Sequence, residues 1–103
     1  MAENDCRRDD EKSEIIALIT RARMGSAEAV EALLLRYRPL IESETRKHYA
    51  EGMTEQDARD LRQEAEIAFC NAVCNYDDSL GGVEFGLYAK ICIGNSLVSF
   101  LRA

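Results

Sequence analysis

Apolar residues recur every three to four positions through the middle of the chain. They are Ala58, Leu61, Ala65, Ala68, Phe69, Ala72, Val73 and Tyr76. This spacing places them on one stripe of an α-helix. Thr54 and Asp57 have the spacing of a capping box, with Asp in place of the usual Glu. The helix is therefore expected to begin near Glu55.

The polar positions of this central helix fall off the apolar stripe. They include Asp60, Gln63, Glu64, Asn71 and Asn75. Because they cannot share the buried side, they must face water or a partner. The helix is thus predicted to have one face that holds the fold together and another that is available for contact.

The same reasoning predicts shorter helices before the central one. Ser13 can cap a first helix that Gly25 ends, and Ser26 can cap a second helix. Pro39 either kinks this second helix or opens a third at its first turn. A short turn over residues 51–55 leads into the central helix.

A last helix is expected from about Phe85 to Leu101, after a turn over residues 77–84 that contains adjacent glycines. Its apolar residues cover more than one side. One side can pack against the central helix, whereas the other needs a partner, a further domain or a ligand, since small monomers rarely expose so much apolar surface.

The composition agrees with this pattern. The 103 residues contain one proline and are rich in Ala, Leu, Glu and Arg, which is typical of a single all-α domain. We expect a small helical bundle of about four to five helices. Residues 1–12 are charged and nearly free of apolar side chains, so they are expected to form a disordered acidic tail before a domain over residues 13–103.

The net charge of −6 argues against a protein that coats nucleic acid through charge alone. It leaves room for a small basic face or for recognition by stacking. The most basic region contains Arg36, Arg38, Arg46 and Lys47, but these residues also fit a solvated helix face paired with neighbouring glutamates. No apolar run is long enough to span a bilayer and no signal peptide is visible, so a cytoplasmic protein is expected.

The sequence does not indicate catalysis or a cofactor. Its four cysteines are expected to be small buried hydrophobes in a reducing compartment, and His48 a packed histidine rather than a metal ligand. We find no nucleophile with a partner base and no phosphate-binding glycine loop, so no enzyme, no metal and no other cofactor are expected.

Several segments together resemble region 2 of the bacterial sigma-70 family of RNA polymerase sigma factors, most closely the alternative, sporulation-type members. They are Asp60–Glu64 (DLRQE), Ala72-Val73, Tyr76-Asp77 and Val83–Ile93 (VEFGLYAKICI). Upstream, Glu31–Ile41 is similar to the first helix of that region, and Ile15–Ala29 to the segment before it. The resemblance covers about residues 13 to 102 and implies a region 2 helical fold.

The resemblance also implies a docking role for the central helix. In the family, this helix binds the clamp helices of the polymerase β′ subunit. The role would fall on Asp60, Gln63, Glu64, Glu66 and Cys70. Without the resemblance, the same residues would be interpreted as an ordinary solvated helix face.

The last helix of this family opens promoter DNA at the minus-ten element and holds unpaired bases of the non-template strand. The resemblance assigns aromatic contacts to Phe85 and Tyr88, and reading of the upstream edge to Asn95 and Val98. Candidate phosphate contacts are Lys90, Arg36, Arg38, Arg46 and Lys47.

Departures from the family pattern keep alternatives open. Ile91 and Cys92 replace the tandem tryptophans of primary sigma factors, and Gly94 replaces a residue that is often basic. A last helix with so few basic residues also fits a degenerate sigma-like regulator that binds polymerase without reading promoter DNA. An anti-sigma factor is a possible partner, a membrane is not expected, and an unrelated helical interaction module is the third hypothesis.

Nothing in the chain resembles the family's C-terminal helix-turn-helix. The sequence therefore fits either one domain of a longer factor or a domain that stands alone.

Overall fold

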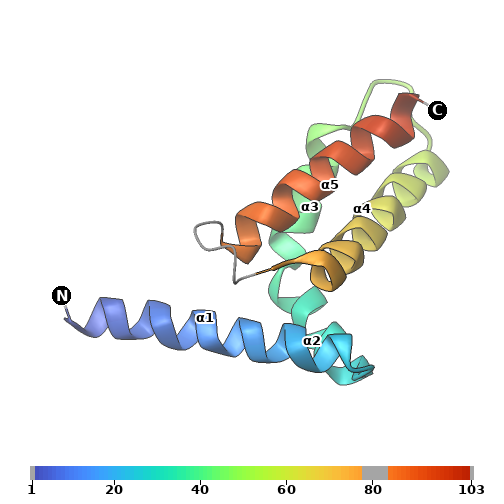
Figure 1. Ribbon diagram of the computed structural model, residues 1–103. Coiled ribbons are helices and arrows are strands. Elements are labelled where there is room, and N and C mark those ends of the chain that lie inside the picture. The colour runs from blue at the N-terminus through green and yellow to red at the C-terminus, as the bar shows by residue number, and fades with distance from the viewer. Residues whose placement is uncertain (1, 78–83, 103) are drawn as a thin grey trace.

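Figure 1 shows the computed structural model, which describes the backbone of residues 2–77 and 84–102 and the side chains of residues 11–77 and 84–102. These residues form five α-helices and no strand, which confirms the predicted all-α bundle. The helices are α1 (Ala2–Arg23), α2 (Ala27–Arg36), α3 (Arg38–Lys47), α4 (Glu55–Asn75) and α5 (Phe85–Arg102). None of the described helices is both long and apolar enough to cross a membrane.

The start of α4 is confirmed in atomic detail. The Thr54 hydroxyl oxygen accepts a hydrogen bond from the Asp57 backbone N–H at 3.1 Å, and the Asp57 carboxylate accepts one from the Thr54 N–H at 3.1 Å. These two bonds satisfy amide groups that have no partner inside the helix. The predicted capping box therefore fixes the first residue of α4 at Glu55.

The boundaries around α2 also follow the sequence. Gly25 has a φ of +98°, which only glycine adopts at low cost, and it separates α1 from α2. Ser26 caps α2 by accepting a hydrogen bond from the Ala29 N–H at 3.2 Å. Pro39 lies in the first turn of α3, so it opens a third helix rather than kinking the second.

The N-terminal boundary differs from the prediction. Helix α1 begins at Ala2, so the expectation that Ser13 caps its first turn is corrected. Residues 2–12 contain no Gly or Pro, and adding turns to an existing helix costs far less than nucleating one. The division into a tail over residues 1–12 and a domain over residues 13–103 stays a prediction.

The core lies where α4 meets α5, with α3 against both. Every residue of the predicted α4 stripe is buried except Ala58, which is half-buried. Small residues such as Ala65, Ala72 and Ala89 let the backbones of α4 and α5 approach closely, and Leu61, Phe69 and Ile93 fill the space around them.

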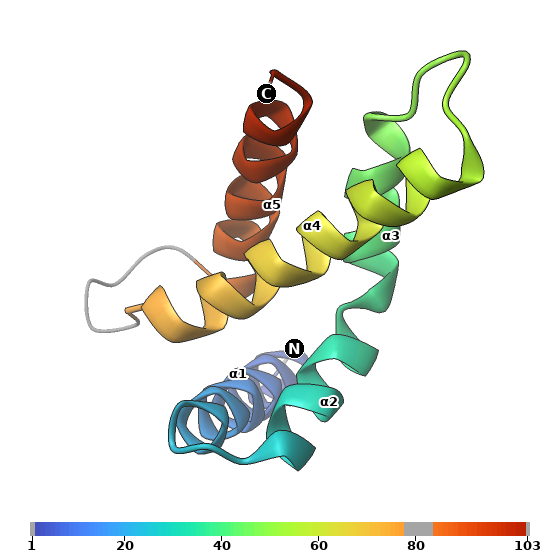
Figure 2. The same ribbon diagram turned by 90° about the vertical axis from the view of Figure 1, so that its right-hand side faces the viewer.

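Helices α1 and α2 form a hairpin at one end of this core, beside the C-terminal end of α4 (Figures 1 and 2). Arg23, in the last turn of α1, ties the hairpin to α4. Its Nε donates to the Val73 carbonyl oxygen at 2.9 Å, and its Nη2 donates to the Tyr76 carbonyl oxygen. A cation at the carbonyl end of a helix also opposes the negative end of the helix dipole. Sequence reasoning did not identify this link.

Candidate nucleic-acid interface

Helix α5 has an exposed apolar side, as the sequence predicted. The residues on it are Leu87 (53% exposed), Ile91 (52%), Val98 (38%) and Leu101 (46%). From Phe85 to Arg102 the helix contains no acidic residue, and its two cations, Lys90 and Arg102, form no ion pair within the described residues. In a chain with net charge −6, this side of α5 is thus an acid-free surface.

The structure brings three of the residues predicted to bind DNA onto this side. Tyr88, Asn95 and Val98 follow the three- and four-residue spacing of one helix face, together with Ile91. Asn95 and Val98 are exposed and Tyr88 is half-buried. Lys90 is exposed too; it is three residues from Leu87, so it lies beside the apolar residues but away from Tyr88.

Phe85 does not belong to the exposed surface, and its prediction as a base-stacking residue is corrected. Its side chain is only 4% exposed. Its ring centroid lies 5.3 Å from those of Tyr37 and Tyr76 and 5.7 Å from that of Phe69, all edge-on. A base needs an open ring face, so Phe85 serves the core instead.

Tyr88 lies at the edge of this aromatic cluster. Its ring centroid is 5.4 Å from that of Tyr76, and Cys92 follows it one helical turn later on α5. Burial raises the pKa of the Tyr88 phenol, and the neighbouring Cys92 raises it further. The phenol is therefore neutral at physiological pH and can act as a hydrogen-bond donor.

A groove of about 130 Å³ runs beside Tyr88 between α4 and α5. Its lining residues are Ala68, Asn71, Ala72, Asn75, Tyr88, Cys92 and Ser96. Sequence reasoning placed Asn71 and Asn75 off the apolar stripe but did not connect them with Ser96. Only the packing of two helices brings these polar groups together.

The residues predicted to dock on polymerase lie on the side of α4 away from its apolar stripe, and Glu64 is two helical turns before Asn71 on that side. Gln63 is exposed, whereas Asp60, Glu64, Glu66 and Cys70 are half-buried. Gln56 donates a hydrogen bond to the Asp60 carboxylate at 2.8 Å. Asp60, Gln63 and Cys70 share one helix face by their spacing, and Glu64 and Glu66 flank it. Gln63 thus remains within reach of a partner.

The centre of this α4 face also contains an apolar residue that sequence reasoning missed. Ile67, between Gln63 and Cys70 on the same face, is 49% exposed. In the sequence, Ile67 is an apolar residue that lies off the buried stripe, and this position could have identified it as exposed. An exposed aliphatic side chain among polar ones is a typical centre of a docking surface.

The cysteines differ in environment. Cys70 and Cys92 are half-buried, but Cys74 is exposed, so the expectation of burial is wrong for Cys74. Burial raises the pKa of the Cys70 thiol, and the neighbouring Cys74 and Glu66 raise it further. Cys70 is therefore a poor nucleophile.

The most basic stretch of the sequence is largely neutralised by ion pairs. Arg36 lies 3.5 Å from Glu14, Arg46 lies 3.9 Å from Glu42, and Lys47 lies 2.6 Å from the buried Glu44. Arg38 alone of the four cations forms no ion pair with a described residue. The arrangement resembles the solvated face considered in the sequence analysis more than a phosphate clamp. Nearby, His48 is half-buried with its Nδ1 2.9 Å from the Glu44 carbonyl oxygen.

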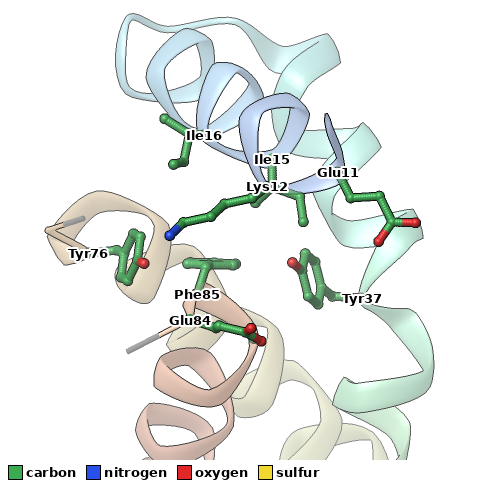
Figure 3. A pocket seen from close by; sticks show the side chains of 9 residues that line it. Glu11, Lys12, Ile15, Ile16, Tyr37, Tyr76, Glu84 and Phe85 are labelled. Carbon is green, nitrogen blue, oxygen red and sulfur yellow. The ribbon is translucent and has the colours of Figure 1, made fainter. Parts of the chain in front are cut away.

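A larger cleft of about 710 Å³ separates α1 from the end of α4 and the start of α5 (Figure 3). Ile15, Ile16, Tyr37, Tyr76 and Phe85 supply apolar walls. The lining also includes Glu11, Lys12, Glu84 and Gly86. Figure 3 shows the Lys12 side chain extending from α1 towards Tyr76 and Phe85, and the Glu11 and Glu84 carboxylates on either side of Tyr37. Two carboxylates against one ammonium disfavour a phosphate in this cleft.

The surroundings of Tyr37 in this cleft raise the pKa of its phenol. Burial raises the pKa of its phenol, Arg36 lowers it, and Glu84, Tyr76 and Glu11 raise it further. Because the raised pKa favours the protonated phenol in the folded state, its stabilising contribution is complete below the unfolded value of about 10 and is lost as the pH rises through the folded pKa.

Tyr37→Phe is therefore expected to match the wild type in pH dependence up to about pH 10 and to become relatively more stable above it. Urea unfolding at several pH values, followed by circular dichroism, measures this difference. Tyr49→Phe alters an exposed phenol and is the matched control. A constant difference between wild type and Tyr37→Phe from neutral to alkaline pH would contradict the assignment.

Comparison with known protein families identifies the class of domain to which the chain belongs. The model of the helix-turn-helix domain family matches residues 16–77, more than half of the chain. The chain therefore belongs to the helix-turn-helix domain family, a class of DNA-binding domains. No significant match was found among curated proteins or among solved structures.

The matched residues run from α1 to the end of α4 and leave α5 outside. Within them, the connection between α1 and α2 over residues 24–26, with Gly25 at positive φ, is typical of a helix-turn-helix unit. The second helix of this unit, α2, exposes Glu28 and Glu31, which repel DNA phosphates. The acid-free side of α5 repels DNA phosphates less than α2 does.

Proposed function

We propose that this chain is the promoter-recognition domain of a sigma-70-type initiation factor. It docks on the β′ clamp helices of core RNA polymerase through α4 and binds the single-stranded minus-ten element along α5. The observation that carries the proposal is the division of α4: its apolar stripe is buried against α5, whereas Gln63 and Ile67 are exposed on the opposite side.

The α4 face supports docking on a helical partner. Acidic and amide groups surround the exposed Ile67, so a partner helix with basic side chains around an apolar residue would be complementary to it. The apolar contact supplies affinity, while Asp60, Glu64 and Glu66 set the register and speed the encounter.

The α5 face supports binding of unpaired bases rather than duplex DNA. Stacking on an apolar and aromatic surface does not need a dense array of cations. Tyr88, Ile91, Asn95 and Val98 provide such a surface, and the absence of carboxylates along α5 avoids repulsion of the phosphates.

Glu64→Lys is expected to reduce capture of core RNA polymerase by the tagged protein by about tenfold, or 1.4 kcal/mol, because a cation then faces the basic partner helix. Gln63→Ala should weaken capture to a smaller extent. Glu31→Lys makes the same change of charge at an exposed position of α2 and serves as the control. Equal capture by all four proteins would mean that α4 does not dock on polymerase.

Tyr88→Ala is expected to weaken binding of a labelled non-template oligonucleotide by about 1–3 kcal/mol, measured by fluorescence anisotropy. Tyr88→Phe keeps the ring and should retain most of the affinity. If the alanine variant binds as tightly as the wild type, Tyr88 does not contact the strand.

A second candidate is a sigma-like regulator that binds polymerase without reading promoters. The favouring observation is the scarcity of available positive charge: α5 contains only Lys90 and Arg102, and three of the four cations near α3 are paired. Capture of a pre-melted promoter fragment by polymerase in the presence of the protein separates the two. Capture that depends on the protein excludes the regulator.

A further inference from the structure

The cleft of about 710 Å³ beside α1 takes no part in the proposed polymerase and DNA contacts. We propose that it binds a small organic cation, a single ammonium group attached to an apolar body. The ammonium lies between the Glu11 and Glu84 carboxylates, and the apolar body lies against Ile15 and Ile16. This inference goes beyond the proposed function and does not depend on it.

The size and walls of the cleft suit a small molecule. Its volume of about 710 Å³ lies within the roughly 300–1,000 Å³ of typical ligand sites. Figure 3 shows Ile15 and Ile16 projecting from α1 on one side and Phe85 on the other, with Tyr37 and Tyr76 at the two ends. An apolar body placed among these side chains is removed from water on several sides, which supplies most of the affinity.

The Tyr37 end of the cleft is negative. Glu11 and Glu84 reach it from opposite walls, and neither forms an ion pair with a residue that the structure describes. Both carboxylates raise the pKa of the Tyr37 phenol, so their fields overlap at this side chain. Arg36 acts in the opposite direction on Tyr37, but it lies 3.5 Å from Glu14. The charges at this end therefore favour a cation.

Lys12 limits the ligand to one positive charge. Its side chain extends along the cleft towards Tyr76 and Phe85, away from the Tyr37 end (Figure 3). A ligand with ammonium groups at both ends would bring its second charge towards the Lys12 ammonium, and like charges repel. A ligand with one ammonium beside Tyr37 instead directs its apolar body towards Lys12. The arrangement thus selects a monocation over a diamine.

The test uses three probes that share a naphthalene ring and differ in charge: naphthylmethylammonium, naphthylmethanol and naphthylacetate. Isothermal titration calorimetry with the full chain measures their affinities. The ammonium probe is expected to bind most tightly and the acetate probe most weakly, because only the ammonium is attracted by the two carboxylates. Raising the salt concentration should weaken binding of the ammonium probe and leave binding of the alcohol unchanged.

Substitutions in the cleft locate the bound ammonium. Glu11→Gln and Glu84→Gln should each weaken its binding by about 2- to 5-fold, the range for exposed ion pairs, without affecting the alcohol. Lys12→Gln should strengthen it by a similar factor, since a competing positive charge is removed. Glu28→Gln makes the same change at an exposed carboxylate of α2 and serves as the control.

Three results would overturn the inference. Equal affinity for the three probes would mean that the cleft takes apolar molecules whatever their charge. Unchanged ammonium binding in both Glu11→Gln and Glu84→Gln would place the cation elsewhere on the protein. Absence of binding by any probe would mean that the cleft holds no small molecule of this kind. None of these results involves polymerase or DNA, so the proposed function stands or fails separately.

Discussion

Phe85→Ala is expected to lower the free energy of unfolding by about 3–5 kcal/mol, the largest effect of any substitution proposed for this chain. The Phe85 ring is 4% exposed and contacts the rings of Tyr37, Phe69 and Tyr76 edge-on. Truncation removes the buried area and these aromatic contacts and leaves a cavity. Since domains of this size are stable by about 5–15 kcal/mol, a large part of the stability would be lost.

Urea unfolding followed by circular dichroism measures this loss. Phe85→Leu keeps most of the apolar volume and should cost less than the alanine variant. It should also bind the non-template oligonucleotide like the wild type, because Phe85 faces the core rather than the strand. A Phe85→Ala protein of normal stability with impaired DNA binding would restore the stacking role that the sequence suggested and contradict the burial.

The burial of Phe85 could not be predicted from the spacing of apolar residues in α5. Spacing places Phe85 and Tyr88 near one another on the same helix, but α5 is apolar on two sides. A periodic pattern identifies helix faces without showing which of two apolar faces is buried. That choice depends on Tyr37 and Phe69, which come from other helices and surround Phe85 in the folded chain.

Features that depend on neighbours in sequence were predicted well. The Thr54–Asp57 capping box, the cap at Ser26 and the turn at Gly25 involve groups three residues apart or fewer, so the sequence alone specifies them. The buried stripe of α4 follows from a single period. Helix α1 extends to Ala2 because helix propensity, and not apolar content, sets its length.

In the candidate site, too, features built from one helix could be predicted and features built from two helices could not. The exposed face of α4 could be predicted because one helix supplies all of its residues. The groove could not, since Asn71 and Asn75 come from α4 and Ser96 from α5, and no pattern within one helix relates them. The ion pairs of Arg46 with Glu42 and of Lys47 with Glu44 lie within one helix and fit the pairing with neighbouring glutamates that the sequence suggested. The pair of Arg36 with Glu14 could not be predicted, because Glu14 comes from another helix.

The link between α1 and α4 through Arg23 is a further contact between distant residues, and its loss is expected to have the second-largest effect. Arg23→Ala should lower the free energy of unfolding by about 1.5–3 kcal/mol, the range for hydrogen bonds from a charged group. The substitution removes the bonds to the Val73 and Tyr76 carbonyl oxygens, which add to the apolar packing of the α1–α2 hairpin against the core. Urea unfolding measures the change.

Two further variants separate this bridge from a simple effect of charge. Arg23→Lys keeps the positive charge at the end of α4 but has no planar group that reaches both carbonyl oxygens, so it should recover only part of the lost stability. Arg21→Ala removes a cation from the same last turn of α1, where the Arg21 side chain is exposed and forms no hydrogen bond or ion pair with a described residue. If Arg21→Ala destabilises as much as Arg23→Ala, helix charge and not the bridge explains the effect. If only the Arg23 variants are destabilised, the effect comes from the bridge of this side chain to acceptors that lie 50 and 53 residues further along the sequence.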